Sequence, residues 1–222
     1  MQGIEAVGLT RAELDVSDAD AICAAIDNEQ PDVVLNAEAF TKVDVCEQER
    51  ELALRVNGEA PGLLAHACRG RALLVHVSTE YVFAGGTNRP IPEDGETDPS
   101  SVYGRSKLAG EAAVCESGCE HLIVRTQWVF GPGPNFVRTI LRAAADGQKL
   151  RVVEDQVGRP TGSRALAEGL VAAVRGELRG TLHLACEGVC SWYDFAREIV
   201  REGAARGLAR PVAVDPIATE EM

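Results

Sequence analysis

The chain has 222 residues, 45% hydrophobic and 25% charged, a composition typical of a folded protein with a sizeable core. Its 34 acidic residues exceed its 22 lysines and arginines, and the net charge of −12 argues against general binding to nucleic acids or anionic membranes. The sequence has no apolar run of bilayer length and no secretory signal core, so it predicts a cytoplasmic protein.

Strand-like and helix-like segments alternate along the first half of the chain. Ser17 or Asp18 is expected to cap the first helix. The alternation predicts a Rossmann-like α/β fold, a doubly wound parallel sheet covered on both faces. The expected strands are Ile4–Leu9, Val33–Ala37, Leu73–Ser78 and Leu122–Thr126, and the expected helices are Ala19–Asn28, Glu47–Ala67 and Ser106–Glu116.

The composition shifts after Gly131-Pro-Gly-Pro134, where a small α/β lobe is expected to begin. We assign residues 1–130 and 151–187 to the Rossmann-like domain, and residues 131–150 and 188–222 to the lobe. The downstream pattern predicts helices and strands at Asn135–Ala145, Leu150–Val153, Ser163–Arg175, Thr181–Leu184, Ser191–Arg206 and Pro211–Val214.

Tyr103 and Lys107 belong to the pentad Tyr-Gly-Arg-Ser-Lys and, on a helix, would share one face. A nearby ammonium favours the phenolate, so such a pair suits acid catalysis. Ser78 and Thr79 end the apolar strand that precedes it, at the edge where open α/β sheets bind ligands. Thr79, Tyr103 and Lys107 could therefore converge on one carbonyl oxygen, although the pair alone also occurs by chance.

These groups belong to a longer pattern that spans almost the whole chain. In the order and spacing of its segments, the chain resembles the extended short-chain dehydrogenase/reductases, and within them the dTDP-4-dehydrorhamnose reductases. The segments that carry the likeness are Pro31–Ala37, Val75–Phe83, Val102–Glu111, Arg125–Gly131, Asn135–Thr139, Asp155–Thr161 and Ser191–Phe195.

The resemblance implies NADPH-dependent reduction of the C4 ketone of dTDP-4-dehydro-6-deoxy-L-mannose to dTDP-L-rhamnose, a step in nucleotide-sugar and cell-surface polysaccharide biosynthesis. Tyr103 would protonate the nascent alkoxide. Lys107 would hold the nicotinamide ribose and depress the pKa of Tyr103. Thr79 would hydrogen-bond the substrate carbonyl. The Rossmann-like domain would bind the dinucleotide, and residues 131–150 and 188–222 would form part of the lobe that binds the sugar nucleotide.

On the substrate side, the resemblance implies contacts from Glu80, Trp128 and Asn135 to the dTDP-sugar. For Trp128 and Asn135, plain structural roles compete with this interpretation: Trp128 could fill the core, and Asn135 could be a turn residue. Glu80 stands where the family usually has Asp, and Gln127 where a small residue is usual, so contacts to the sugar are expected to differ.

Arg11 follows the first expected strand, and a basic residue there accommodates the 2′-phosphate of NADPH. The alternative is that Arg11 faces solvent, and NADH stays an option. The resemblance also leaves room for Mg²⁺ and for a homodimer. The expected cofactor edge consists of Arg11, Asp15, Val16, Asn36, Ala37, Thr41 and Lys107.

The amino-terminal segment departs from the family pattern because it lacks the Gly-rich turn that binds the cofactor pyrophosphate. We expect that the first βα unit is missing, that neighbouring strands are left unpaired, and that the sequence is cut at both ends or naturally short. Glu38 adds a carboxylate that could repel the cofactor phosphates.

Two other functions stay open. One is another nucleotide-sugar reductase or epimerase, because the same catalytic groups serve many substrates. The other is a non-catalytic regulatory subunit resembling that of methionine adenosyltransferase. No metal site is expected, because Cys115 and Cys119 with His121, like the Cys186, Cys190 and His183 set, fit no common zinc module.

Overall fold

The computed structural model describes residues 4–86 and 89–221. Residues up to Arg125 form one compact unit together with Leu178–His183, and Thr126–Glu177 form a second with the residues from Leu184 onward. The assignment of residues 151–187 to a dinucleotide-binding domain stays a prediction, because compactness does not decide which residues bind a nucleotide.

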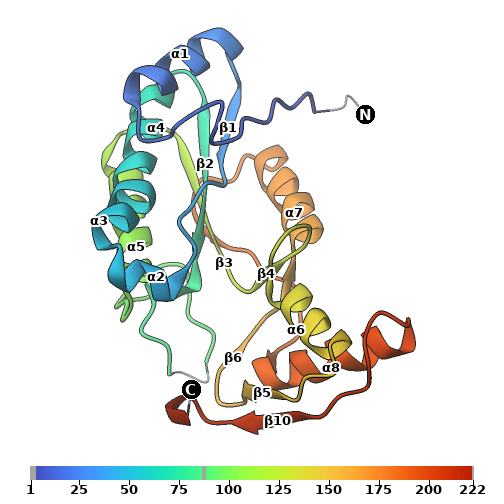
Figure 1. The fold of residues 1–222 in the computed structure, drawn as a ribbon. Coiled ribbons are helices and arrows are strands. Elements are labelled where there is room, and N and C mark those ends of the chain that lie inside the picture. The colour runs from blue at the N-terminus through green and yellow to red at the C-terminus, as the bar shows by residue number, and fades with distance from the viewer. Residues whose placement is uncertain (1–3, 87–88, 222) are drawn as a thin grey trace. The chain divides into compact units, whose positions relative to one another are not determined.

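The first unit is built on a sheet with the strand order β1-β2-β3-β8, in which β1 pairs with β2, and β3 with β8, in parallel (Figure 1). The α/β prediction is therefore confirmed. The elements of the first unit are α1 (Ala19–Glu29), β1 (Val33–Asn36), α2 (Val43–Gln48), α3 (Arg50–Ala53), a π-helical segment (Leu54–Glu59), α4 (Ala60–Cys68), β2 (Leu73–Thr79), a 3-10 turn (Glu80–Val82), α5 (Val102–Glu116), β3 (His121–Thr126) and β8 (Gly180–His183).

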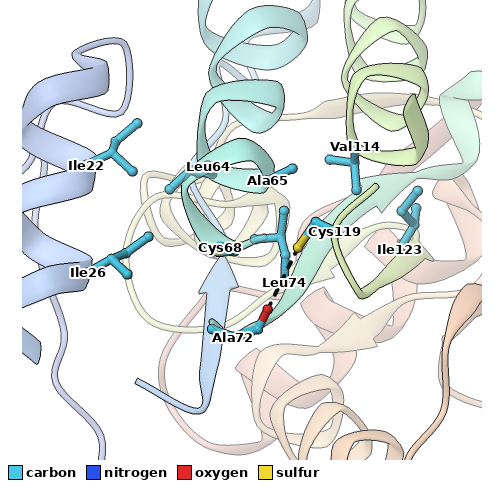
Figure 2. Packing of buried hydrophobic residues seen from close by; sticks show 10 residues of the cluster. All are labelled: Ile22, Ile26, Leu64, Ala65, Cys68, Ala72, Leu74, Val114, Cys119 and Ile123. Carbon is cyan, nitrogen blue, oxygen red and sulfur yellow. Dashed lines mark hydrogen bonds between the residues drawn. The ribbon is translucent and has the colours of Figure 1, made fainter. Parts of the chain in front are cut away.

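Helices α1, α4 and α5 bury their apolar residues against one face of this sheet. Figure 2 shows Ile22 of α1 and Leu64 of α4 beside Leu74 of β2, with Val114 of α5 next to Ile123 of β3. All five side chains are buried. Removing such apolar surface from water is the main favourable term in folding, so this cluster fixes how α5 lies on the strands.

The expected strand Ile4–Leu9 is wrong. Residues 4–9 have no regular structure, and Ile4 and Val7 are 57% and 62% exposed. A strand needs a neighbour for its backbone hydrogen bonds, and no described strand pairs with this segment. Strand β1 is an edge of the sheet, and its Leu35 is 52% exposed on the face opposite α1. At β1, the second face of the sheet is therefore open within this unit.

Several boundaries differ from the expected ones for local reasons. Helix α1 begins as expected, with the Asp18 carboxylate accepting the N–H groups of Asp20 and Ala21. Helix α5 starts four residues earlier than expected, because Ser101 Oγ accepts the Gly104 N–H at 3.0 Å and caps it at Val102. The single helix expected over 47–67 is instead a series that breaks at Glu49 and contains the π-helical segment.

The second unit packs α6 against α8 around apolar side chains that include Ile140 and Ile199. The strand expected at Pro211–Val214 is shifted, because Val214–Ile217 is the stretch that pairs in parallel with Leu150–Val153. The elements of the second unit are β4 (Val129–Phe130), α6 (Phe136–Ala145), β5 (Leu150–Val153), β6 (Val157–Gly158), β7 (Thr161–Gly162), α7 (Ser163–Arg175), β9 (Cys190–Ser191), α8 (Trp192–Ala205) and β10 (Val214–Ile217).

Candidate active site

Helix α5 lies very close to the segments that follow β2 and precede α4, because two of its glycines leave room. A Cβ at Gly104 would lie 2.2 Å from the Tyr81 carbonyl oxygen, and a Cβ at Gly110 would lie 2.2 Å from that of Asn57. No side chain fits at either position without a backbone shift. The pentad noted in the sequence therefore contains a glycine that lets Tyr103 approach the end of β2.

Thr79, Glu80 and Tyr103 form one polar cluster at the carboxyl end of β2. Thr79 Oγ1 donates to Glu80 Oε2 at 3.0 Å, and the Tyr103 ring meets Tyr81 edge-on with centroids 5.5 Å apart. Burial raises the pKa of Tyr103, and the Glu80 charge raises it further, whereas a side-chain hydrogen bond with Thr79 lowers it. Burial also raises the pKa of Glu80 to about 7. Tyr103 is therefore a protonated phenol at neutral pH.

Lys107 is buried on the same helix and faces other partners. Its Nζ donates to the Val77 carbonyl oxygen at 2.8 Å and lies 3.1 Å from His76 Nε2. Burial lowers the pKa of Lys107 to about 8, and the charge of Glu111 opposes part of this effect. The expectation that Lys107 depresses the pKa of Tyr103 is not met: that pKa is raised, and the amine contacts His76 and Val77 instead.

A buried ion pair lies behind the cluster. Arg125 of β3 and Glu111 of α5 meet at 2.7 Å, with side chains only 9% and 5% exposed. Ser78 Oγ donates to Glu111 at 2.5 Å, and Arg125 also donates to the Glu93 carbonyl oxygen at 3.1 Å. These bonds connect β2, α5 and β3 with the long segment after the 3-10 turn, so the pair fixes the strand that carries Thr79 relative to the helix that carries Tyr103.

The expected cofactor residues Arg11, Asp15 and Val16 lie together in a hollow of about 240 Å³. The sequence did not indicate Arg55, whose guanidinium, like that of Arg11, lowers the pKa of Asp15 after the larger effect of hydrogen bonds from Ser17. Helical periodicity could not have found Arg55, because it lies in the π-helical segment. The hollow is lined by Arg11, Leu14, Asp15, Val16, Ser17, Glu38, Leu52, Arg55 and Val56.

The remaining cofactor candidates lie at the end of β1 or after it. Asn36 is buried, and its Oδ1 accepts the Glu38 N–H at 3.1 Å. Ala37 and Thr41 are exposed. The structure places all three at the carboxyl end of β1, the same edge of the sheet as Thr79. Their roles toward a cofactor stay predictions.

Trp128 and Asn135 belong to the second unit. Trp128 stacks on Trp192 with centroids 3.6 Å apart and has a φ of 48°, a left-handed conformation that is costly for a bulky residue and typical of functional sites. Asn135 caps α6: its Oδ1 accepts the Arg138 N–H, and its Nδ2 donates to the carbonyl oxygen of Gly131 at 2.7 Å. Asn135 therefore has a structural role at the turn into α6, as the alternative interpretation expected.

Within residues 4–86 and 89–221, no group of three His, Cys, Asp or Glu side chains could hold a metal ion. Cys115 Sγ and His121 Nε2 are 3.8 Å apart without a third ligand from such a group. The Mg²⁺ suggested by the resemblance thus finds no support in the described residues. None of the described helices is long and apolar enough to cross a membrane.

Comparison with known proteins places the chain in one family. Residues 1–222 match the RmlD substrate binding domain. The chain is 41% identical to dTDP-4-dehydrorhamnose reductase of Burkholderia thailandensis, over 96% of this chain and 75% of the relative. It is 40% identical to dTDP-4-keto-6-deoxy-D-glucose reductase of Streptomyces niveus, over 97% and 76%. The structure of dTDP-4-dehydrorhamnose reductase from Bacillus anthracis in complex with NADP, at 33% identity, aligns with a TM-score of 0.90 over 96% and 75%.

Proposed function

The chain belongs to the dTDP-4-dehydrorhamnose reductase family, and we propose that it reduces the C4 ketone of dTDP-4-dehydro-6-deoxy-L-mannose to dTDP-L-rhamnose with NADPH. The observation that carries the proposal is the polar cluster at the end of β2. There, a buried and protonated Tyr103, whose pKa responds to both Thr79 and Glu80, lies one helical turn from a buried Lys107.

The side chains have distinct roles in the proposed reaction. The reduced nicotinamide, when bound, supplies the hydride. The Thr79 hydroxyl orients the carbonyl oxygen, and Tyr103 gives its phenolic proton to that oxygen as negative charge develops on it. A raised pKa keeps this proton on Tyr103 until the oxygen becomes basic. Lys107 lies on the same face of α5, where its amine can hold a ribose hydroxyl of the nucleotide.

The assignment of NADPH rests on the guanidinium groups of Arg11 and Arg55, which line the hollow together with the carboxylates of Asp15 and Glu38. Replacing Arg11 by alanine is expected to weaken NADPH binding about tenfold, because a charge-assisted contact to the 2′-phosphate is lost. NADH affinity should stay nearly unchanged. Isothermal titration with both nucleotides tests this, with Arg164→Ala, an exposed arginine of α7, as the control. An equal loss for both nucleotides would remove Arg11 from cofactor selection.

Glu38 lines the same hollow and is expected to oppose the binding of an anionic nucleotide. Glu38→Gln removes the charge with little change in shape, so NADPH affinity should rise about threefold at low salt, and the gain should shrink as salt screens the remaining charges. Titrations at two salt concentrations measure this effect. A variant that binds NADPH more weakly would mean that the carboxylate contacts the nucleotide favourably.

Turnover tests the reaction itself. The purified chain should oxidise NADPH in the presence of dTDP-4-dehydro-6-deoxy-L-mannose, and the product should be dTDP-L-rhamnose. A second candidate is the reduction of another dTDP-linked keto sugar, favoured by the likeness to the Streptomyces niveus reductase. Comparing kcat/KM for the two classes of keto sugar separates these candidates. A chain that binds NADPH but turns over neither class would favour the non-catalytic alternative.

A further inference from the structure

A histidine that the proposed chemistry does not use connects β1 to Lys107. Asn36 Oδ1 accepts the Glu38 N–H at 3.1 Å, and Asn36 Nδ2 lies 3.1 Å from His76 Nδ1. On the other side of the ring, His76 Nε2 lies 3.1 Å from Lys107 Nζ, which donates to the Val77 carbonyl oxygen at 2.8 Å. Asn36, His76 and Lys107 are 4%, 0% and 1% exposed, so bulk water cannot replace a missing partner.

The orientation of the Asn36 amide decides where the hydrogens lie. Because its oxygen accepts the Glu38 N–H, its nitrogen faces His76, and an amide nitrogen only donates. His76 Nδ1 is therefore the bare nitrogen, and a neutral imidazole then carries its hydrogen on Nε2. That hydrogen points at Lys107. An ammonium has no lone pair to accept this hydrogen, whereas a neutral amine has one. The hydrogen bonds from Asn36 to His76 and from His76 to Lys107 are therefore both made only when Lys107 is neutral.

We propose that His76 is a positioning residue for the reductase, whose Nε2–H is donated to Lys107 Nζ when that amine is neutral and so stabilises the neutral form before nucleotide binds. Its meaning for catalysis rests on the proposed function. The hydrogen positions themselves are a property of the chain alone. When Lys107 takes up a proton, the bond from His76 is lost, so the ring and the amide of Asn36 must rearrange together.

The charges around the pair agree with this assignment. Burial, and then the charge of Lys107, lowers the pKa of His76 well below its usual range, so the imidazole is neutral. Glu111 on α5 favours the ammonium form of Lys107, but it is paired with Arg125 of β3 at 2.7 Å. From β1, only the uncharged Asn36 faces the ring. Burial thus lowers the pKa of Lys107 more than the charge of Glu111 raises it.

The first test reads the tautomer of His76 without added nucleotide. The chain has 4 histidines, so ¹⁵N-histidine labelling gives a spectrum simple enough to assign with His66→Phe and His76→Phe. At about pH 9, above the pKa of Lys107, we expect the two ¹⁵N shifts of His76 to report the Nε2–H tautomer. An Nδ1–H tautomer at that pH would overturn the proposal, and this measurement needs no variant to be active.

The second test is the sign of a shift. His76→Phe removes the donor that stabilises the neutral amine, so the titration of Lys107, followed by ¹³C-labelled lysine, should move up by about one pH unit. If His76 instead accepted a hydrogen from the ammonium, the same variant would move the titration down, and the proposal would fail. Exposed His66→Phe should cause no shift, and Lys42 and Lys149, the other lysines, serve as internal references.

The link to the reductase is read from NADPH affinity as a function of pH. With the Lys107 ammonium as a charged donor to the ribose, NADPH affinity should fall above about pH 8 in the native chain as that charge is lost, and this fall should move to higher pH in His76→Phe. An NADPH profile that keeps its midpoint in the variant, while the lysine titration moves, overturns the positioning role. Failure to bind NADPH at any pH, with the expected tautomer present, would count against the proposed function instead.

Discussion

Replacing Tyr103 by phenylalanine is expected to slow the turnover of dTDP-4-dehydro-6-deoxy-L-mannose by roughly 10²–10⁴-fold, the usual contribution of a positioned general acid. The aromatic ring, which packs beside Tyr81 at 5.5 Å, is kept, so the helix should not move. NADPH affinity should change little, because the phenol serves the substrate oxygen. Steady-state kinetics together with isothermal titration separate these two quantities.

The matched control is Tyr193→Phe, because Tyr193 lies on α8 and its ring contacts Arg197. That variant loses the same hydroxyl group and should keep the native kcat. If Tyr103→Phe also kept the native kcat, Tyr103 would have no part in proton transfer. A loss of NADPH binding in Tyr103→Phe would instead indicate that the helix had shifted and that the kinetic result reports structure.

The convergence of Thr79 and Tyr103 could be predicted from sequence because both follow from simple rules. A buried parallel strand ends at Thr79, and ligands of such sheets bind at that edge. Helix periodicity then puts Tyr103 and Lys107 on one face. Helix periodicity shows which face a side chain occupies, but not which residue it contacts. His76 lies in an apolar run and reads as core, so its contact with Lys107 became visible only in the structure.

Local pattern also fails where a segment depends on a distant partner. Residues 4–9 contain enough apolar residues for a strand, yet no described strand supplies their hydrogen bonds, and Val7 stays exposed. Conversely, the apolar periodicity of Ser163–Arg175 is local, and α7 has those bounds. The strand at Val214–Ile217 follows the register of Leu150–Val153 and not its own composition. Strands with a continuous apolar run, such as Leu73–Thr79, were predictable although they pair with distant segments, whereas the segment at 4–9 and the boundaries of Val214–Ile217 were not.

Replacing Arg125 by methionine is expected to reduce the free energy of unfolding by about 3–5 kcal/mol, because it leaves the Glu111 carboxylate buried without its partner. The side chains of the pair are 9% and 5% exposed, so water cannot take over. The Glu93 carbonyl oxygen also loses its donor. Urea unfolding followed by circular dichroism measures the loss. Arg71→Met, which breaks the exposed pair with Asp27, is the control and should change stability little.

The double variant Arg125→Met with Glu111→Leu distinguishes a buried charge from a lost contact. If the cost comes from an unpaired carboxylate, removing that carboxylate as well should restore most of the stability, even though Ser78 Oγ then loses its acceptor. If the double variant is as unstable as Arg125→Met alone, the cost lies in packing and in the bond to Glu93. The ion pair joins α5, which carries Tyr103, to β3, and Ser78 joins it to β2. If the introduced methionine and leucine pack less tightly than the native pair, α5 can move relative to β2. The kcat of the double variant should then fall below the native value even where its stability is restored.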